Sequence, residues 1–188
     1  PIFVTVTPNP AIDWTLSVPG FAAGIVNRVR DHRSDAGGKG VNVACFLADL
    51  GREVLATGFL GSENAASFEA LFAQRRIGDR FVRVPGATRT GIKIVDPDRD
   101  ATTDVNFPGL HPPENAVRER LRRVGELAEP GRWFVLAGSL PPGAPKDLYA
   151  RLVDAIHAGG GRAAVDTSGP ALQEALAEVT KLEGYELK

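Results

Sequence analysis

Three glycines and a lysine precede an apolar run in the segment 36–44, Ala-Gly-Gly-Lys-Gly-Val-Asn-Val-Ala. Because glycine has no Cβ, its backbone can pass close to a ligand and can turn through positive φ. The helix predicted over 41–50 adds N–H groups with partial positive charge, and Lys39 adds a full charge. These residue types suit a small anionic or polyhydroxylated ligand. A glycine-rich turn that only begins a helix would have the same composition.

The spacing around Lys39 excludes two common phosphate-binding motifs. Lys39 is followed by glycine and not by Ser or Thr, so the segment is not a Walker A loop. The third glycine of the dinucleotide fingerprint is missing from 38–43, which leaves a nicotinamide-dependent oxidoreductase as a weak alternative. Residues 30–35 are highly polar, so we expect no strand to lead directly into the glycines.

Three further side chains stand where they could do chemistry. Asp13 follows the first apolar strand and could accept hydrogen bonds from two hydroxyls of a sugar. Arg89, in Thr-Arg-Thr-Gly, could clamp a phosphate through two parallel hydrogen bonds. Ser139 lies in a turn fixed by glycine and proline directly after a strand. Each also has an ordinary explanation, as a turn aspartate, a solvated loop arginine and a rigid connection.

The composition narrows the classes of partner. The 188 residues include 22 basic and 23 acidic side chains, so no electrostatic case exists for nucleic acid or an anionic membrane. The single cysteine, Cys45, excludes an internal disulfide and favours a reducing, cytoplasmic setting. The three histidines show no metal-ligand spacing. The arginines of 118–123 look like the solvated face of a helix.

Strand-like and helix-like segments alternate, which predicts an α/β protein with a largely parallel sheet. The predicted strands are 2–6, 53–60, 80–84, 133–136 and 163–165, and the predicted helices are 41–50, 63–74, 113–124, 146–157 and 170–177. Four strands without intervening helices, 14–18, 25–29, 90–95 and 102–107, predict a small antiparallel sheet beside the main one.

The spacing of these motifs resembles one known family. Gly37, Gly38, Asn42, Ala44, Gly51 and Gly61 fall in register with the first signature of the ribokinase-like, or phosphofructokinase-B, carbohydrate kinases. The segment 138–143, Gly-Ser-Leu-Pro-Pro-Gly, is similar to that of the 1-phosphofructokinase and tagatose-6-phosphate kinase group, and 106–109 and 165–170 match it too.

The resemblance implies a ribokinase-like fold, with a mostly parallel central sheet flanked by helices and a small antiparallel β lid. Residues 1–188 would be the N-terminal part of one domain, with the lid at about 13–34 and 88–108. A lid of this kind covers the sugar and is often used to form a homodimer.

The resemblance also implies an activity, the phosphorylation of fructose 1-phosphate to fructose 1,6-bisphosphate with ATP and Mg²⁺. The nearest alternative substrates are tagatose 6-phosphate and fructose 6-phosphate. The implied substrate-binding residues are Asp13, Gly37, Gly38, Lys39, Asn42, Arg89 and Ser139. Lys181 and Glu186 match part of the family's nucleotide motif, and Glu186 would help hold Mg²⁺. The family's catalytic base lies in a Gly-Ala-Gly-Asp motif that this sequence does not contain. The alternative is therefore a truncated, non-catalytic fragment that binds a sugar phosphate.

Overall fold

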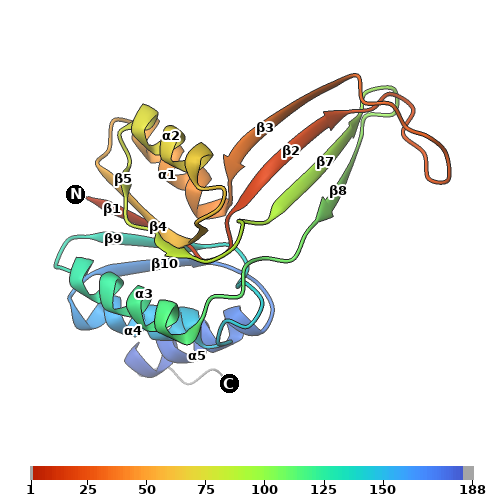
Figure 1. Cartoon of the computed structure of the whole chain (residues 1–188). Coiled ribbons are helices and arrows are strands. Elements are labelled where there is room, and N and C mark those ends of the chain that lie inside the picture. Colours follow the sequence, from red (N-terminus) through yellow and green to blue (C-terminus); the bar gives the residue numbers. More distant parts are fainter. Residues whose placement is uncertain (1, 184–188) are drawn as a thin grey trace.

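The computed structural model describes residues 2–183 and confirms the predicted alternation of strands and helices (Figure 1). In chain order the elements are β1 (Phe3–Thr7), β2 (Ala11–Ser17), β3 (Asp31–Gly37), α1 (Lys39–Asp49), β4 (Val54–Gly61), α2 (Ala66–Arg75), β5 (Gly78–Asp79), β6 (Val82–Val84), β7 (Thr90–Asp96), β8 (Ala101–Asn106), α3 (Glu114–Leu127), β9 (Trp133–Ala137), α4 (Leu148–Ala158), β10 (Arg162–Asp166) and α5 (Pro170–Glu183).

The main sheet is parallel throughout and has the order β10-β9-β1-β4-β5, with β6 also pairing with β4. Parallel strands need crossover connections, and the helices supply them. All carboxyl ends of these strands therefore lie at one edge of the sheet. In Figure 1 this edge faces the second sheet.

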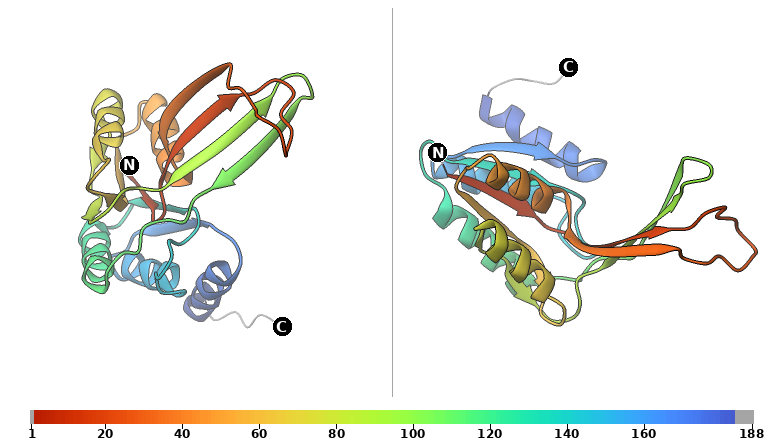
Figure 2. Two further views of the ribbon diagram at one scale, coloured as in Figure 1. Left: turned by 45° about the vertical axis from the view of Figure 1, so that its right-hand side comes forward. Right: turned by 90° about the horizontal axis from the view of Figure 1, so that it is seen from above.

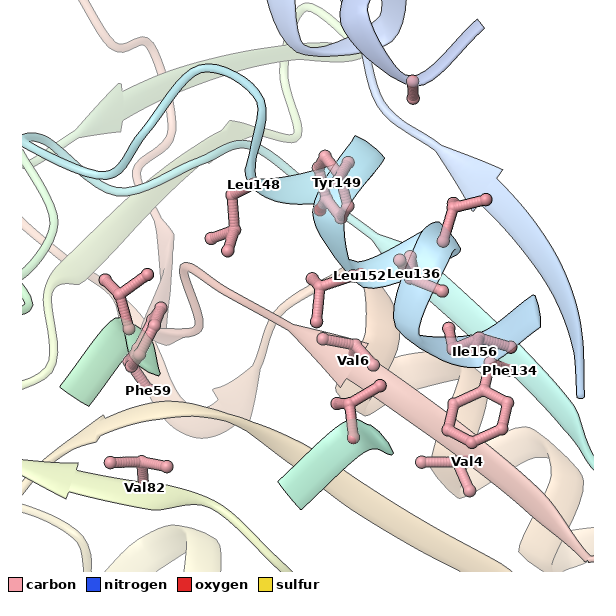
Figure 3. Close-up of a cluster of buried hydrophobic side chains, with 14 of the residues drawn as sticks. Val4, Val6, Phe59, Val82, Phe134, Leu136, Leu148, Tyr149, Leu152 and Ile156 are labelled. Atoms are coloured by element: carbon pink, nitrogen blue, oxygen red, sulfur yellow. The ribbon is translucent and has the colours of Figure 1, made fainter. Parts of the chain in front are cut away.

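Helices cover both faces of the main sheet, as Figures 1 and 2 show. α1 and α2 pack on one face, where Val41, Phe68 and Phe72 are buried against side chains of β4. α3, α4 and α5 pack on the other face, over a core centred on β1 and β9 (Figure 3). Burial on both faces explains why the strands read as nearly continuous apolar runs.

The strand β1 shows how the sequence separates the two faces. Val4 and Val6 point into the core shared with α4, as Figure 3 shows. Thr5 and Thr7 are just as buried but alternate with the valines, so they face the α1 side. A Cβ on Gly40 would collide with the Thr7 hydroxyl and lie 3.0 Å from the Val6 carbonyl oxygen. Glycine at this position therefore lets α1 begin directly against the carboxyl end of β1.

Four strands form a second sheet, called here the lid sheet, which projects from the carboxyl edge of the main sheet (Figure 2). Its order is β3-β2-β7-β8. β2 pairs antiparallel with β3, and β7 pairs antiparallel with β8, but β2 and β7 are parallel. The lid sheet is thus mixed and not wholly antiparallel. The reason is that β2 and β7 both leave the main sheet in the same direction.

The two faces of the lid sheet differ in character. Cross-strand register places Asp13, Asp35, Gly91 and Asn106 on one face, with Lys93, Asp104 and Arg33 farther along it. The opposite face carries Ile12, Trp14, Leu16, Ile92, Ile94 and Val105. Trp14 is 38% exposed and Val105 is 46% exposed. Ile12, at the base of this face, packs against the core under α1 and α2, whereas Trp14 and Val105 stay exposed farther along it.

Two sequence-based expectations about the lid are wrong. Residues 25–29 are not a strand, because the partner of β2 is the later segment β3. β3 also leads directly into the glycines at 37 and 38, where we expected no strand. Its first five residues are exposed, so both faces meet solvent and no hydrophobic alternation marks the strand.

The arginines of α3 are not all on a solvated face. Arg120 is only 1% exposed, and its guanidinium lies 5.2 Å above the ring of Phe59 and donates to the Thr57 hydroxyl of β4. Its neighbours Arg118, Arg122 and Arg123 pair with glutamates of the same helix. The helical turn places Arg120 with Ala116, Val117 and Val124 on the face that packs against the sheet.

Cys45 is half-buried on α1, as expected for a packed thiol. In the described residues, no helix combines the length and the hydropathy that a membrane-spanning segment requires.

Candidate functional site

The candidate site lies at the carboxyl edge of the main sheet, beneath the lid sheet (Figure 1). Ligands of open parallel sheets bind at this edge because the loops that follow the strands converge there. The loop after β1 carries Asn9, the loop after β9 carries Ser139, and β10 ends at Asp166. Two adjoining hollows occupy this region.

The first hollow, called here the Asp13 hollow, measures about 520 Å³. Its lining is mostly polar, and the polar face of the lid sheet supplies most of it. From outside the lid sheet it receives Asn42 of α1. The structure therefore brings together three predicted substrate-binding residues, Asp13, Gly37 and Asn42.

Two glycines make room for the Asp13 carboxylate. Gly37 of β3 and Gly91 of β7 lie on the strands that flank β2. A Cβ on Gly91 would stand 2.5 Å from Asp13 Oδ1, and a Cβ on Gly37 would collide with Asp13 Oδ2. The carboxylate therefore occupies the space that side chains at positions 37 and 91 would fill.

Burial and neighbouring charges shift the pKa of Asp13 in opposite directions. Burial raises the pKa of the Asp13 carboxyl above its ordinary value, and the nearby Asp35 and Asp104 act in the same direction. Arg89 and Lys93 oppose this shift because a positive charge favours the ionised form. An ionised Asp13 is an acceptor only, which suits it to bind two hydroxyl groups.

The second hollow, called here the Arg89 hollow, measures about 440 Å³ and contains Arg89, Ser139 and Asn9. Asn9 connects the other two, because its side-chain amide donates to Ser139 Oγ at 3.1 Å and its main-chain carbonyl oxygen accepts from Arg89 Nη2 at 3.4 Å. The Nε of Arg89 is buried and has no partner among the described residues. A guanidinium with spare donors beside a hydroxyl is a suitable receptor for phosphate.

The loop that carries Arg89 is fixed by its neighbours. Thr88 is buried, and its hydroxyl accepts from the Gly61 amide at 2.9 Å. The Asn64 side chain holds both the N–H and the carbonyl of Thr88, at 2.7 and 3.0 Å. Arg89 itself accepts at its carbonyl oxygen from Ile12 at 2.9 Å. These bonds place Arg89 between β4 and the base of the lid.

Lys39 lies apart from both hollows. It is the first residue of α1, and its ammonium lies 3.2 Å from each carboxylate oxygen of Asp166. Among the described residues that line the two hollows, Lys39 does not appear. The side chains of Lys39 and Asp166 are 61% and 64% exposed, and such ion pairs are worth at most about 1 kcal/mol.

Asp166 is tied to the loop that carries Ser139. The Gly138 amide donates to the Asp166 carbonyl oxygen at 2.9 Å. The Gly138 carbonyl oxygen accepts from Tyr149 Oη at 2.8 Å and from Thr167 Oγ1 at 2.9 Å. The ends of β9 and β10 therefore form one rigid platform.

Gly38 begins α1 with a φ of 122°, a conformation that favours glycine. A Cβ there would lie 2.9 Å from the Thr7 side chain, so glycine also allows the close approach to β1. No side chain caps this helix end. Its first N–H groups therefore have no side-chain cap, and the binding role expected of Gly37 and Gly38 stays a prediction.

Two further residues were predicted from the sequence to bind the nucleotide and the metal. Lys181 belongs to the last turn of α5, and Glu186 lies outside the described residues. In the described part of the chain, no group of three or more His, Cys, Asp or Glu side chains could hold a metal ion. The described residues therefore do not fit a Mg²⁺ site.

A larger hollow, of about 620 Å³, lies between β6 and α3 and shares no lining residue with the first two. Its two arginines are already neutralised, since Arg83 pairs with Asp79 and Glu69, and Arg123 pairs with Glu119. This hollow offers no free charge to a ligand, and we do not assign it as the site.

Sequence reasoning missed several residues of the site. Asn9 stands between two prolines in the sequence, and its bond to Ser139 joins residues 130 positions apart. Lys93 and Arg33 could be found only from the register of the lid strands. For Asn9, the available signal was its place directly after the first parallel strand.

A scan against protein families matches residues 6–187 to pfkB family carbohydrate kinases. This chain belongs to the pfkB carbohydrate kinase family. The 1-phosphofructokinase of Rhodobacter capsulatus is 52% identical over 176 residues, which are 92% of this chain and 55% of that relative. The 1-phosphofructokinase of Xanthomonas campestris is 44% identical over 185 residues, 98% of this chain and 58% of that relative. The pfkB chain thus spans little more than half the length of these two relatives.

Solved structures agree with the family. The phosphofructokinase-2 of Escherichia coli in complex with fructose-6-phosphate matches with a TM-score of 0.86 at 27% identity, over 99% of this chain and 65% of that one. A possible 1-phosphofructokinase from Thermotoga maritima matches with a TM-score of 0.84 at 30% identity, over 94% of this chain and 57% of that one. Together with the parallel sheet and its lid, these likenesses confirm the predicted ribokinase-like α/β fold.

Proposed function

We propose that this chain is the sugar-phosphate-binding part of an ATP-dependent kinase that converts fructose 1-phosphate to fructose 1,6-bisphosphate. The observation that carries the proposal is the pair of adjoining hollows, one built around a carboxylate and the other around a guanidinium and a hydroxyl. A phosphohexose has hydroxyls for the first and a phosphate for the second. The curated relatives that are 52% and 44% identical are 1-phosphofructokinases, which favours fructose 1-phosphate over tagatose 6-phosphate or fructose 6-phosphate.

The geometry supports a role for each residue. In this proposal Asp13 accepts hydrogen bonds from two sugar hydroxyls, and Asn42 contacts the sugar from the α1 side. Gly37 and Gly38 let the main chain approach the ligand. Arg89 and Ser139 bind the phosphate already present on the sugar. Lys39 would join them only after exchanging Asp166 for the phosphate, an exchange that the exposure of the pair makes inexpensive.

Phosphoryl transfer requires more than these residues. Membership in a kinase family implies a phosphoryl donor, which we take to be ATP with Mg²⁺. Since the described residues do not fit a metal site, we assign no step of the transfer to them. The activity of the whole enzyme is part of the proposal, and the catalytic base stays unassigned.

The lid suggests a partner for the chain. On the outer part of its apolar face, Trp14 and Val105 are exposed. We propose that a second copy of the chain covers this face, because a large exposed apolar patch marks an association surface. We also propose that the described residues form the N-terminal part of one ribokinase-like domain, and that the single cysteine reflects a cytoplasmic setting.

Binding of fructose 1-phosphate measured by isothermal titration calorimetry tests the proposal. We expect Arg89→Ala to weaken binding by about 10- to 100-fold, since a charge-assisted hydrogen bond contributes about 1.5–3 kcal/mol. The loss should be largest at low salt. Arg52→Ala is the matched control, because Arg52 is an exposed arginine that precedes β4 at the opposite edge of the sheet. Equal affinity of the Arg89→Ala variant and the wild-type chain would contradict the assignment.

A second candidate function is binding without transfer. The same two hollows would serve it, because holding a sugar phosphate needs no phosphoryl donor. A coupled assay for fructose 1,6-bisphosphate at millimolar ATP separates the two candidates. Saturable binding of fructose 1-phosphate with no turnover would support the second.

A further inference from the structure

Asn106 lies where the Asp13 hollow and the Arg89 hollow adjoin. It is the last residue of β8, and among the described residues it alone lines both the Asp13 hollow and the Arg89 hollow. A ligand that reaches from Asp13 to Arg89 must therefore pass beside this side chain.

The backbone holds Asn106 in place on both sides. It pairs with Gly91 across the β7–β8 ladder, and the next residue, Phe107, donates its N–H to the Thr90 carbonyl oxygen at 3.1 Å. Because Gly91 has no side chain, the Asn106 amide and the Asp13 carboxylate share the space above it. A Cβ at position 91 would lie 2.5 Å from Asp13 Oδ1 and 3.5 Å from Asn106 Oδ1.

The Asn106 amide is free for a ligand. Within the described part of the chain its side chain makes no hydrogen bond, whereas the neighbouring Asn9 amide is engaged with Ser139. A carboxamide offers two N–H donors and one carbonyl acceptor, so it can bond a hydroxyl group in either sense. Unlike Asp13 it carries no charge, and it does not repel a phosphate.

We propose that Asn106 is a further specificity-determining residue, whose amide binds a hydroxyl of the phosphosugar between the hydroxyls on Asp13 and the phosphate on Arg89. The inference rests on the proposed function and adds one contact to it. A site that hydrogen-bonds a substrate hydroxyl discriminates against analogues that lack it, because its polar group is then left unpaired. Asn106 would thereby help to select among phosphohexoses that differ at this carbon.

The first test compares variants of the whole chain by calorimetric titration with fructose 1-phosphate and with inorganic phosphate. We expect Asn106→Ala to weaken binding of fructose 1-phosphate about 5- to 10-fold and to leave binding of phosphate unchanged. Asn106→Asp should weaken both, because a carboxylate beside the Arg89 hollow repels the phosphate. Thr103→Ala, on the opposite face of the same strand, is the control and should bind as the wild-type chain does.

The second test identifies the contact with monodeoxy analogues of fructose 1-phosphate. The analogue that lacks the hydroxyl bound by Asn106 should bind the wild-type chain and the Asn106→Ala variant with equal affinity, because neither complex can make this hydrogen bond. If every analogue loses the same factor in both proteins, Asn106 touches no hydroxyl and the inference is overturned. An Asn106→Ala variant that binds fructose 1-phosphate as tightly as the wild-type chain overturns it too. A wild-type chain that binds no phosphosugar refutes the proposed function itself, and the inference with it.

Discussion

The substitution Gly91→Ala tests the geometry of the Asp13 hollow without removing any polar group. The added Cβ would stand 2.5 Å from Asp13 Oδ1, about 0.9 Å inside the 3.4 Å at which ordinary van der Waals contact begins. Gly91 lies in a regular strand without positive φ, so alanine fits its backbone. The Asp13 carboxylate must therefore swing away from position 91.

We expect this displacement to remove about one charge-assisted hydrogen bond to the sugar, or roughly 1.5–3 kcal/mol. The dissociation constant for fructose 1-phosphate should rise by about 10- to 100-fold. Calorimetric titration measures the change, and far-UV circular dichroism verifies the fold.

Gly125→Ala is the matched control, because Gly125 lies within α3 and a Cβ there meets nothing within 4 Å. It should leave affinity unchanged and add about 0.5–1 kcal/mol of stability, since glycine is unfavourable within a helix. A folded Gly91→Ala variant with wild-type affinity would refute the placement of the sugar hydroxyls on Asp13.

Three further predictions concern stability and assembly. Arg120→Met should raise the free energy of unfolding measured in urea, because an apolar chain replaces a buried guanidinium whose Nε and Nη2 lack partners among the described residues. Arg120→Ala should lower this free energy by about 2–4 kcal/mol, because it leaves a cavity. Similar losses in both variants would contradict the explanation. Burial raises the pKa of Asp13, so its ionised form destabilises the folded state above that pKa and not at low pH. Asp13→Asn should therefore be more stable than the wild-type chain near pH 7, and this gain should disappear toward pH 3. A gain that does not depend on pH would argue against burial of the charge as its cause. Trp14→Asp, on the apolar face of the lid sheet, should convert a dimer to a monomer in analytical ultracentrifugation, and a wild-type chain that is monomeric at all concentrations would rule out this interface.

The main sheet could be predicted because its strands carry a strong signal. Strands such as β1 and β9 are short apolar runs, each followed by glycine or proline, and parallel order follows from the helices between them. The strand β3 could not be predicted, since its exposed residues leave no apolar pattern. Its pairing depends on β2, which only the folded chain brings beside it.

The sequence offered candidate site residues one by one, but it could not give their arrangement in space. The structure places Asp13 with Asn42, and Arg89 with Ser139, although each pair is far apart in sequence. Lys39 was expected beside the phosphate, yet its charge is directed to Asp166, 127 positions along the chain. Arg120 shows the same limit, because a cluster of arginines on a helix does not reveal which one faces the core.

The most direct test of the central claim is a crystal structure of this chain with fructose 1-phosphate. We predict that the phosphate contacts Arg89 and Ser139 while two hydroxyls of the same molecule contact the Asp13 carboxylate. A sugar phosphate bound at saturating concentration with its phosphate elsewhere, or with Asp13 facing solvent, would contradict the account.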